Sequence, residues 1–141
     1  MKRVSVLILA FCMLVSMFMA APVYATDSGK CGENLTWTFD DLTGTLTISG
    51  TGAMHDYNYY YYNRPWESYE DNMKKVVIEN GVASISQNAF YDCDYITDVI
   101  VADTVKFIGA EAFDNCNRLK NINIPDSVKL IGDYAFLYCD N

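Results

Sequence analysis

Hydrophobic residues recur at a fixed interval through the C-terminal half of the chain. Phe90, Phe113 and Phe136 are separated by steps of 23 residues. Four more apolar columns keep the same step: Val82, Val105 and Val128; Ile85, Ile108 and Ile131; Ala89, Ala112 and Ala135; Cys93, Cys116 and Cys139. A constant period within roughly 20–50 residues predicts a solenoid, in which each coil buries its apolar side against the neighbouring coils.

Each repeat has two halves with different periodicity. The first half, residues 73–78 in the first repeat, has the spacing apolar-x-x-apolar-x-apolar, which predicts a short strand with one buried face. In the second half Ile85, Ala89 and Cys93 stand four residues apart, as on one face of a short helix. Ser86 suits the N-cap of that helix, and glycines stand there in the later repeats. The prediction is an α/β (α+β) solenoid whose 23-residue coils each contain a parallel strand, a turn and a short helix.

The segment before the repeats alternates apolar and polar residues twice, over residues 35–39 and 45–49. Turn-forming residues at 40–44 separate the two segments, so a β-hairpin is predicted. We expect this hairpin to cover the open end of the first coil with its apolar side chains, which are Leu35, Trp37, Phe39, Leu46 and Ile48. Residues 26–32 are short and polar, and we expect them to be flexible.

One repeat carries a pattern that is similar to a known family. The run IGAEAFDNCNRLKNINIP, from Ile108 to Pro125, follows I-G-x-x-A-F-x-x-C-x-x-L-x-x-I-x-I-P. It resembles the BspA-type leucine-rich repeat, a family of bacterial and protist cell surfaces, and the match extends from Met73 to Asn141. The segment CGENLTWTFDDLTGTLTISGTGAM through RPWESY also resembles the N-terminal cap of such proteins. The resemblance implies a binding or adhesion module without catalysis.

The N-terminus has the pattern of a secretory signal peptide. Lys2 and Arg3 precede an apolar run over residues 4–21, and Val23 and Ala25 suit a cleavage site after residue 25. A retained membrane anchor is the alternative, because the run nearly has the length of a span. The predicted organisation is a signal peptide over 1–25, a cap with the hairpin and a tyrosine-rich loop over 26–72, and three coils over 73–141, of which the last is incomplete. The expected location is secreted or on the extracellular surface.

The net charge limits the classes of partner that the chain can bind, and the cysteine positions indicate whether its thiols are free. Loss of Lys2 and Arg3 with the signal peptide would change the formal net charge from −8 to −10, so no binding to nucleic acid or to anionic membrane is expected. No other apolar run could span a bilayer after signal cleavage. The Cys93, Cys116 and Cys139 column faces inward, where buried free thiols are the favoured interpretation and a bridge between Cys93 and Cys116 is the alternative.

No pattern of a catalytic, metal or cofactor site is present. His55 is the one histidine, and no nucleophile stands near it in the sequence. The cysteines lack zinc-site spacing, and the acidic residues lack the spacing of a calcium loop. We therefore expect no enzyme, no metal and no cofactor. A hydrolase would require a pocket that brings His55 together with a nucleophile and an acid.

The positions that vary between coils are the candidates for recognition. The outward residues of the predicted strands are Lys75, Val77 and Glu79, then Asp98, Ile100 and Ala102, then Asn121 and Asn123. The inward columns stay constant while these residues change, and Val77, Ile100 and Ala102 form an apolar stripe. This face is expected to bind a protein of a cell surface or matrix. A solvated surface, or contact with a second copy, are the alternatives.

A run of tyrosines offers a second candidate site. Tyr57 begins the run, and the proposed ligand-binding residues in it are Tyr59, Tyr60, Tyr61 and Tyr62. An exposed aromatic platform would suit a glycan, as in a carbohydrate-binding accessory module. The alternative is an irregular capping loop whose rings lie on the edge of the repeats. Self-association through the open C-terminal coil is a further prediction.

Overall fold

The computed structural model describes residues 26–57 and 63–140. In this part of the chain, nine strands and one 3₁₀ helix follow one another. They are β1 (Thr26–Lys30), β2 (Asn34–Asp40), β3 (Thr45–Ala53), η1 (Glu67–Asn72), β4 (Lys75–Ile78), β5 (Val82–Ile85), β6 (Asp98–Val101), β7 (Phe107–Ile108), β8 (Asn121–Asn123) and β9 (Leu130–Ile131).

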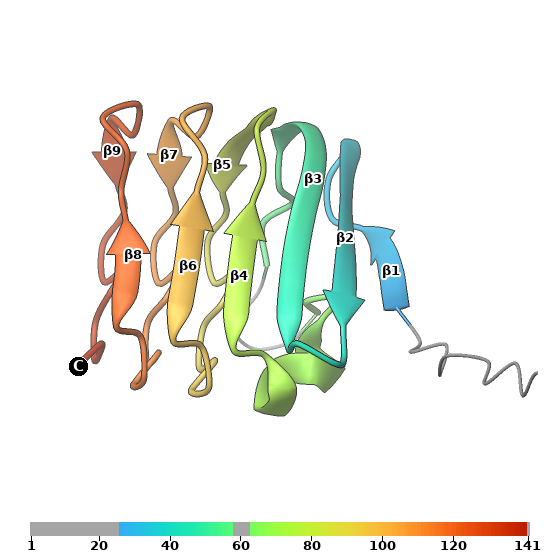
Figure 1. The fold of residues 1–141 in the computed structure, drawn as a ribbon. Helices are drawn as coiled ribbons and strands as arrows, with labels where there is room; N and C mark the ends of the chain where they lie inside the picture. The colour runs from blue at the N-terminus through green and yellow to red at the C-terminus, as the bar shows by residue number, and fades with distance from the viewer. Residues whose placement is uncertain (1–25, 58–62, 141) are drawn as a thin grey trace, which may run out of the picture.

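The strands form one curled sheet with β3 at its centre. The order is β8-β6-β4-β3-β5-β7-β9, and every pair along this path is parallel. The first part of β3 pairs with β4 and its last two residues pair with β5, so β3 joins a front row and a back row of strands (Figure 1). Each repeat contributes one strand to each row, which confirms the predicted parallel solenoid.

The repeated apolar columns fill the space between the two rows. Phe90 and Phe113 are fully buried, and their ring centroids are 5.1 Å apart with an interplanar angle of 18°. Phe136 continues the stack at 5.4 Å from Phe113. Trp66 precedes the stack at 5.5 Å from Phe90. The phenylalanine column is therefore one ladder of stacked rings, and Trp66 is its first member.

The predicted short helix is wrong. The segment from Ser86 to Cys93 consists of successive turns, in which Ala89, Tyr91 and Cys93 donate their N–H groups to carbonyls three residues earlier at 3.3 Å. The intervening N–H groups bond to the next coil, as from Phe90 to the carbonyl of Ala112 at 2.8 Å. Every fourth residue of these turn segments has a positive φ, namely Asn88, Asp92, Glu111, Asn115, Tyr134 and Tyr138. Bonds between coils thus replace the bonds that a helix would make within one coil.

The residue expected to cap that helix has a different role. A Cβ atom added to Gly109 would clash with the backbone nitrogen of Gln87 in the preceding coil. One added to Gly132 would clash with the backbone nitrogen of Ala110 in the same way. Glycine stands at this column because the backbones of neighbouring coils touch there, and no N-cap is formed.

The N-terminal hairpin is present and closes one end of the solenoid. β2 and β3 pair antiparallel from Asp40–Thr45 to Asn34–Thr51. Their inward side chains Leu35, Trp37, Phe39, Leu46 and Ile48 are all buried. The expected flexibility of residues 26–32 is wrong, since β1 pairs along its whole length with β2. A polar segment becomes a strand here because the neighbouring edge of β2 offers it backbone partners.

The cap also supplies hydrogen-bond donors to the turns of the first coil. In the second coil, the carbonyls of residues 110, 112 and 114 accept bonds from the N–H groups of residues 88, 90 and 92. The equivalent carbonyls of the first coil belong to Gln87, Ala89 and Tyr91. Their donors are the N–H of Tyr57 at 3.3 Å, the indole Nε1 of Trp66 at 3.0 Å and the guanidinium Nη1 of Arg64. These three groups stand where a preceding coil would place its backbone.

Arg64 is the buried cation of this arrangement. Its side chain is 4% exposed, and its Nη2 forms an ion pair with Glu70 at 3.0 Å. Burial raises the pKa of the Glu70 carboxyl above its ordinary value, while Arg64 acts in the opposite direction. Around this ion pair, Trp66 is fully buried and Tyr69 packs against the core.

The described cysteines are free thiols. Cys31, Cys93 and Cys116 are buried and Cys139 is half-buried. The Sγ of Cys116 donates to the carbonyl of Phe90 at 3.2 Å, and that of Cys139 donates to the carbonyl of Phe113 at 3.1 Å. Inward-facing thiols thus bond to the neighbouring coil. Over residues 26–57 and 63–140, no helix has the length and apolar character to cross a membrane.

Candidate recognition surface

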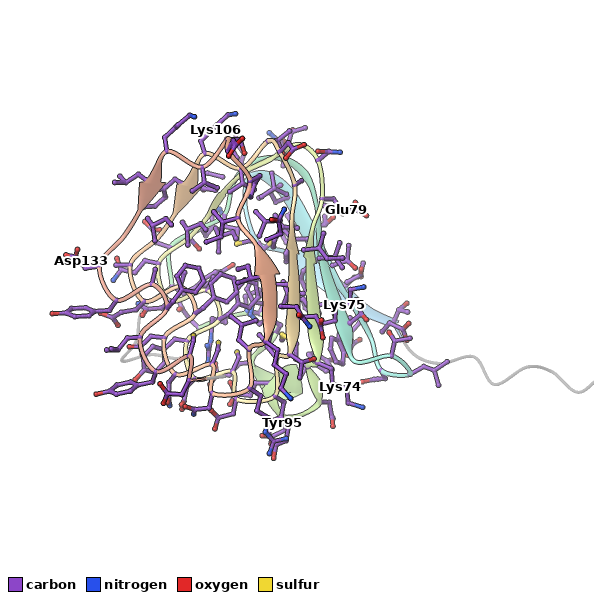
Figure 2. The ribbon with its side chains drawn as sticks, turned by 60° about the vertical axis from the view of Figure 1, so that its left-hand side comes forward. Lys74, Lys75, Glu79, Tyr95, Lys106 and Asp133 are labelled. Carbon is purple, nitrogen blue, oxygen red and sulfur yellow. The ribbon has the colours of Figure 1, made fainter. Side chains whose placement is uncertain are left out.

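The outer side of the front row of strands carries the residues that vary between coils. Strand pairing aligns Lys75 with Asp98 and Asn121, and Val77 with Ile100 and Asn123. Glu79 and Ala102 follow at the ends of β4 and β6. All eight predicted residues on these strands are exposed or half-buried: Lys75, Val77, Glu79, Asp98, Ile100, Ala102, Asn121 and Asn123. We call this set the recognition face. Figure 2 shows Lys75 and Glu79 along one side of the molecule and Asp133 on the opposite side.

Alternation along each strand creates this face. In β4 the side chains of Val76 and Ile78 are buried, so those of Lys75 and Val77 point the other way. In β6 the buried residues are Val99 and Val101, and Ile100 lies between them with 49% of its surface exposed. Since the buried positions hold the solenoid together, the outward positions are free to differ from coil to coil.

An apolar centre lies between two shallow depressions on the recognition face. One depression is lined by residues 77–80 and 100–103. The other is lined by Lys75, residues 98–100 and residues 120–123. Ile100 borders both depressions, with Val77 beside it in the adjacent strand. A partner that covers Ile100 would therefore contact residues of all three coils.

A polar and charged row runs beside this centre. The Asp98 carboxylate accepts hydrogen bonds from the Thr97 hydroxyl at 2.6 Å and from the Asn121 amide at 2.7 Å. These two bonds, with Lys75 and Lys120 nearby, lower the pKa of the exposed Asp98 carboxyl. Asp98 is consequently ionised at neutral pH and held in place by its neighbours.

The hairpin extends this face, which the repeat pattern alone did not predict. Thr47 of β3 pairs with Val77, and Thr38 of β2 pairs with Thr47. Thr36 and Ser49 exchange a hydroxyl hydrogen bond at 3.2 Å on the same outward side. Hydroxyl groups therefore extend the recognition face across the cap. Threonine alternates with apolar residues at 36–38 and 45–49, which indicates that the threonine side chains point outward. This pattern was used only to predict the strands.

Tyr57, the first residue of the tyrosine run, lies in the core of the cap. Tyr57 is 7% exposed, and its ring meets that of Trp66 edge-on at 5.4 Å. Its carbonyl accepts a hydrogen bond from Asn88 at 3.1 Å. Tyr57 is therefore part of the cap and is not available to a glycan platform. The candidate residues Tyr59 to Tyr62 lie outside the described residues.

No catalytic arrangement accompanies these surfaces in the described residues. His55 is exposed, and its backbone N–H bonds to the carbonyl of Cys31 at 2.8 Å. Within residues 26–57 and 63–140, no three His, Cys, Asp or Glu side chains gather where they could hold a metal ion. Burial raises the pKa of the Cys93 thiol to about 12, which disfavours its nucleophilic thiolate form.

Comparison with known proteins supports the repeat assignment. The model of the BspA type Leucine rich repeat region (6 copies) matches residues 67–141. Among solved structures, the chain is similar to a leucine-rich repeat protein from Eubacterium ventriosum, with 35% identity and a TM-score of 0.73 over 80% of this chain and 30% of that chain.

Two further structures are similar to the chain. A leucine-rich repeat protein from Bacteroides ovatus shows 30% identity and a TM-score of 0.48, over 78% of this chain and 27% of that chain. A leucine rich cell surface protein from Faecalibacterium prausnitzii shows 26% identity and a TM-score of 0.49, over 82% of this chain and 35% of that chain. Comparison with curated proteins gives no significant match. The chain thus spans only 27% to 35% of the length of these three structures.

The period of the columns and the parallel pairing of successive coils agree with the match to the family model. The chain belongs to the family of BspA-type leucine-rich repeat proteins.

Proposed function

We propose that this chain is a non-catalytic recognition module that binds a protein partner through the recognition face. The observation that carries the proposal is the exposure of Ile100, which is 49% exposed between two buried valines of β6. A large aliphatic side chain at the centre of a polar rim is the arrangement that protein interfaces use. The leucine-rich repeat fold is itself typical of protein interaction.

The mixed chemistry of the face favours protein over the other classes of partner. Lys75, Glu79 and Asp98 place both signs of charge around the apolar centre, and the threonines add hydroxyl groups. A strongly acidic chain, at a formal net charge of −8, repels nucleic acid and anionic lipid. A protein surface can match this combination of an apolar centre and polar rim.

The proposed location is outside the cell, either secreted or on the surface, where the module would mediate adhesion. Lys2, Arg3 and the apolar run that follows them support export. We infer the same division as above: a signal peptide over 1–25, a cap over 26–72 and coils over 73–141. Expression in a secreting bacterial host should release a product whose N-terminal residue is Thr26. A product that retains the apolar run in the membrane would contradict the cleavage.

Binding to purified matrix and cell-surface proteins, measured by biolayer interferometry, tests the face directly. Ile100→Lys should weaken binding at least about tenfold, because it places a charge at the apolar centre. Leu42→Lys is the matched control, since Leu42 is 63% exposed in the turn between β2 and β3. If both variants reduce binding equally, or neither does, the recognition face is not the binding site.

A further inference from the structure

The two ends of the front strands carry charges of opposite sign on the recognition face. Glu79 follows β4 directly and Asp103 lies two residues beyond β6, so both carboxylates lie at the C-terminal ends of these strands. Lys75 begins β4 and Lys120 directly precedes β8, so both lysines lie at the N-terminal ends. Figure 2 shows Glu79 above Lys75 on the same side of the molecule. The face therefore has an acidic end and a basic end.

Each charged end borders one of the two shallow depressions. Glu79 and Asp103 line the first depression, which has a formal charge of −2 from these two carboxylates. Ala102 also lines it, and its small side chain leaves room for a group of a partner. The second depression has a formal charge of +1, because it is lined by two lysines, Lys75 and Lys120, and by Asp98. The apolar centre at Ile100 thus separates two depressions of opposite charge.

The charges at both ends are available to a partner. Three of the four side chains that define the ends are exposed, and the fourth, Lys75, is half-buried. Within the described residues, none of the four forms an ion pair. Asp98 is different, because its carboxylate already accepts hydrogen bonds from Thr97 and Asn121. The two lysines therefore determine the sign of the basic end.

We propose that the recognition face binds an extended segment of a partner protein whose side chains follow the order basic, apolar, acidic. This inference rests on the function proposed above and adds the chemistry of the partner. The basic side chain lies at Glu79 and Asp103, and the apolar side chain covers Ile100. The acidic side chain lies at Lys75 and Lys120. Complementary charges at both ends fix the orientation of the segment and disfavour partners with the wrong charge order.

The spacing of the face matches an extended segment. Lys75, Val77 and Glu79 alternate along one strand, and alternate residues of a strand lie about 6.6 Å apart. The acidic and basic ends are therefore about 13 Å apart. In an extended segment, alternate side chains repeat at the same interval on one side. The first, third and fifth residues of such a segment can thus meet the acidic end, the apolar centre and the basic end together.

A random library of short linear peptides displayed on phage tests the charge order. Binders are selected on the immobilised chain, and those that also bind the Ile100→Lys variant are removed. The remaining peptides depend on the recognition face. They should be enriched in sequences that place a basic, an apolar and an acidic residue at alternate positions, read in either direction.

Reversal of the acidic end gives the sharpest comparison. The double variant Glu79→Lys with Asp103→Lys should bind the selected peptides at least about tenfold more weakly, because their basic residue then meets like charge. Replacement of that basic residue of the peptide by glutamate should restore binding to the variant, which also shows that the variant is folded. The matched control is Glu33→Lys with Asp133→Lys, which makes the same change in net charge at exposed residues outside both depressions. The control should bind the original peptides as the unmodified chain does.

The outcomes separate this inference from the proposed function. Peptides that depend on Ile100 but show no charge order would overturn the inference and leave the proposed function intact. Equal weakening by the charge reversal and by its control would also overturn it. Basic and acidic residues about nine positions apart would contradict an extended segment, because a helix spans 13 Å with about that number of residues. If no selected peptide depends on Ile100, the inference fails together with the proposed function.

Discussion

The two ends of the described solenoid differ in how far their apolar side chains are covered. At the N-terminal end, the hairpin, Arg64 and Trp66 cover the first coil, and both of these side chains are buried. At the C-terminal end, which β8 and β9 form in Figure 1, Leu130 of β9 and Tyr138 remain exposed. A coil stabilises its neighbours but cannot terminate a stack, so termination requires a segment of different sequence.

The cap shows what such a segment must reproduce. It shares little sequence with a repeat, yet Trp66 supplies both a ring for the phenylalanine ladder and an N–H donor for the carbonyl of Ala89. Arg64 supplies a donor for the carbonyl of Tyr91. An end is therefore closed by matching the hydrogen-bond pattern of a coil together with its apolar column.

The largest expected difference between the two ends concerns their aromatic rings. Trp66→Ala should lower the free energy of unfolding by about 3–5 kcal/mol, because a fully buried ring and its hydrogen bond are lost. Phe136→Ala should cost about 1–2 kcal/mol, because Phe136 is only half-buried. Urea denaturation followed by circular dichroism measures both values. Equal losses would show that the open end is as well packed as the capped one.

Substitution of Arg64 should cause the next largest loss in the free energy of unfolding. Arg64→Met should cost about 1–3 kcal/mol, since it removes the donor to the Tyr91 carbonyl and the cation that pairs with Glu70. Arg118→Met is the matched control, because Arg118 is exposed and lies over the Tyr95 ring at 4.5 Å. The control should cost less than about 0.5 kcal/mol. Similar unfolding midpoints for the two variants would contradict a capping role for Arg64.

Alkaline pH should weaken the fold through its buried thiols. Burial raises the pKa of Cys93 from an ordinary value of 9.0 to about 12. The unfolded chain therefore releases this proton before the folded chain does, and stability that is present below pH 9.0 is lost as the pH rises towards 12. The loss from this thiol is about 1.4 kcal/mol per pH unit within that window.

Measurement of unfolding free energy between pH 8 and pH 11, at roughly half-unit steps, checks the sign. Cys93→Ala should flatten the decline more than Cys139→Ala, because Cys139 at the open end is only half-buried. A stability that rises above pH 9.0 would contradict protonated thiols in the folded state.

The smallest expected difference between the two ends is the rate at which their thiols become accessible to a labelling reagent. Cys139 is expected to react with a maleimide roughly tenfold faster than Cys93 or Cys116, because it needs less local opening. Mass spectrometry of peptides from the native, briefly labelled protein gives the three rates. Labelling of Cys93 as fast as Cys139 would mean that the capped end opens as readily as the open one.

The solenoid and its core could be predicted from the sequence because they follow from repeated spacing alone. Phe90, Phe113 and Phe136 had to share one environment once their step was constant, and the strand pattern at 73–78 set which side faces inward. The recognition face followed from the same alternation, as the complement of the buried positions. Features that depend on the pattern within one coil, or that every coil repeats, could therefore be predicted from the sequence.

The turns could not be distinguished from helices because both place residues four apart on one side. Ile85, Ala89 and Cys93 satisfy either structure, and the choice depends on hydrogen bonds to the next coil. Asn88 and Asp92 belong to the residue types that tolerate a positive φ, which was a weak indication. Glu111 gives no such indication at the same position.

Contacts between residues that are far apart in the sequence could not be predicted either. Arg64 bonds to a carbonyl 27 residues later, and nothing in its own neighbourhood indicates that contact. The strand at Thr26–Lys30 lacks an apolar alternation and exists because β2 pairs with it.

The contact between coil backbones at Gly109 and Gly132 limits how such an array can lengthen by duplication of its gene segments. The first coil has Ser86 in this column, next to Gln87, whose carbonyl accepts a hydrogen bond from Tyr57 of the cap. If a duplicate of that coil were inserted farther along, its serine Cβ would clash with the backbone of the preceding coil. A Cβ added to Gly109 would make the same clash. A coil that is to stack behind another coil without further change therefore needs glycine at this column, and only the first coil can carry serine there.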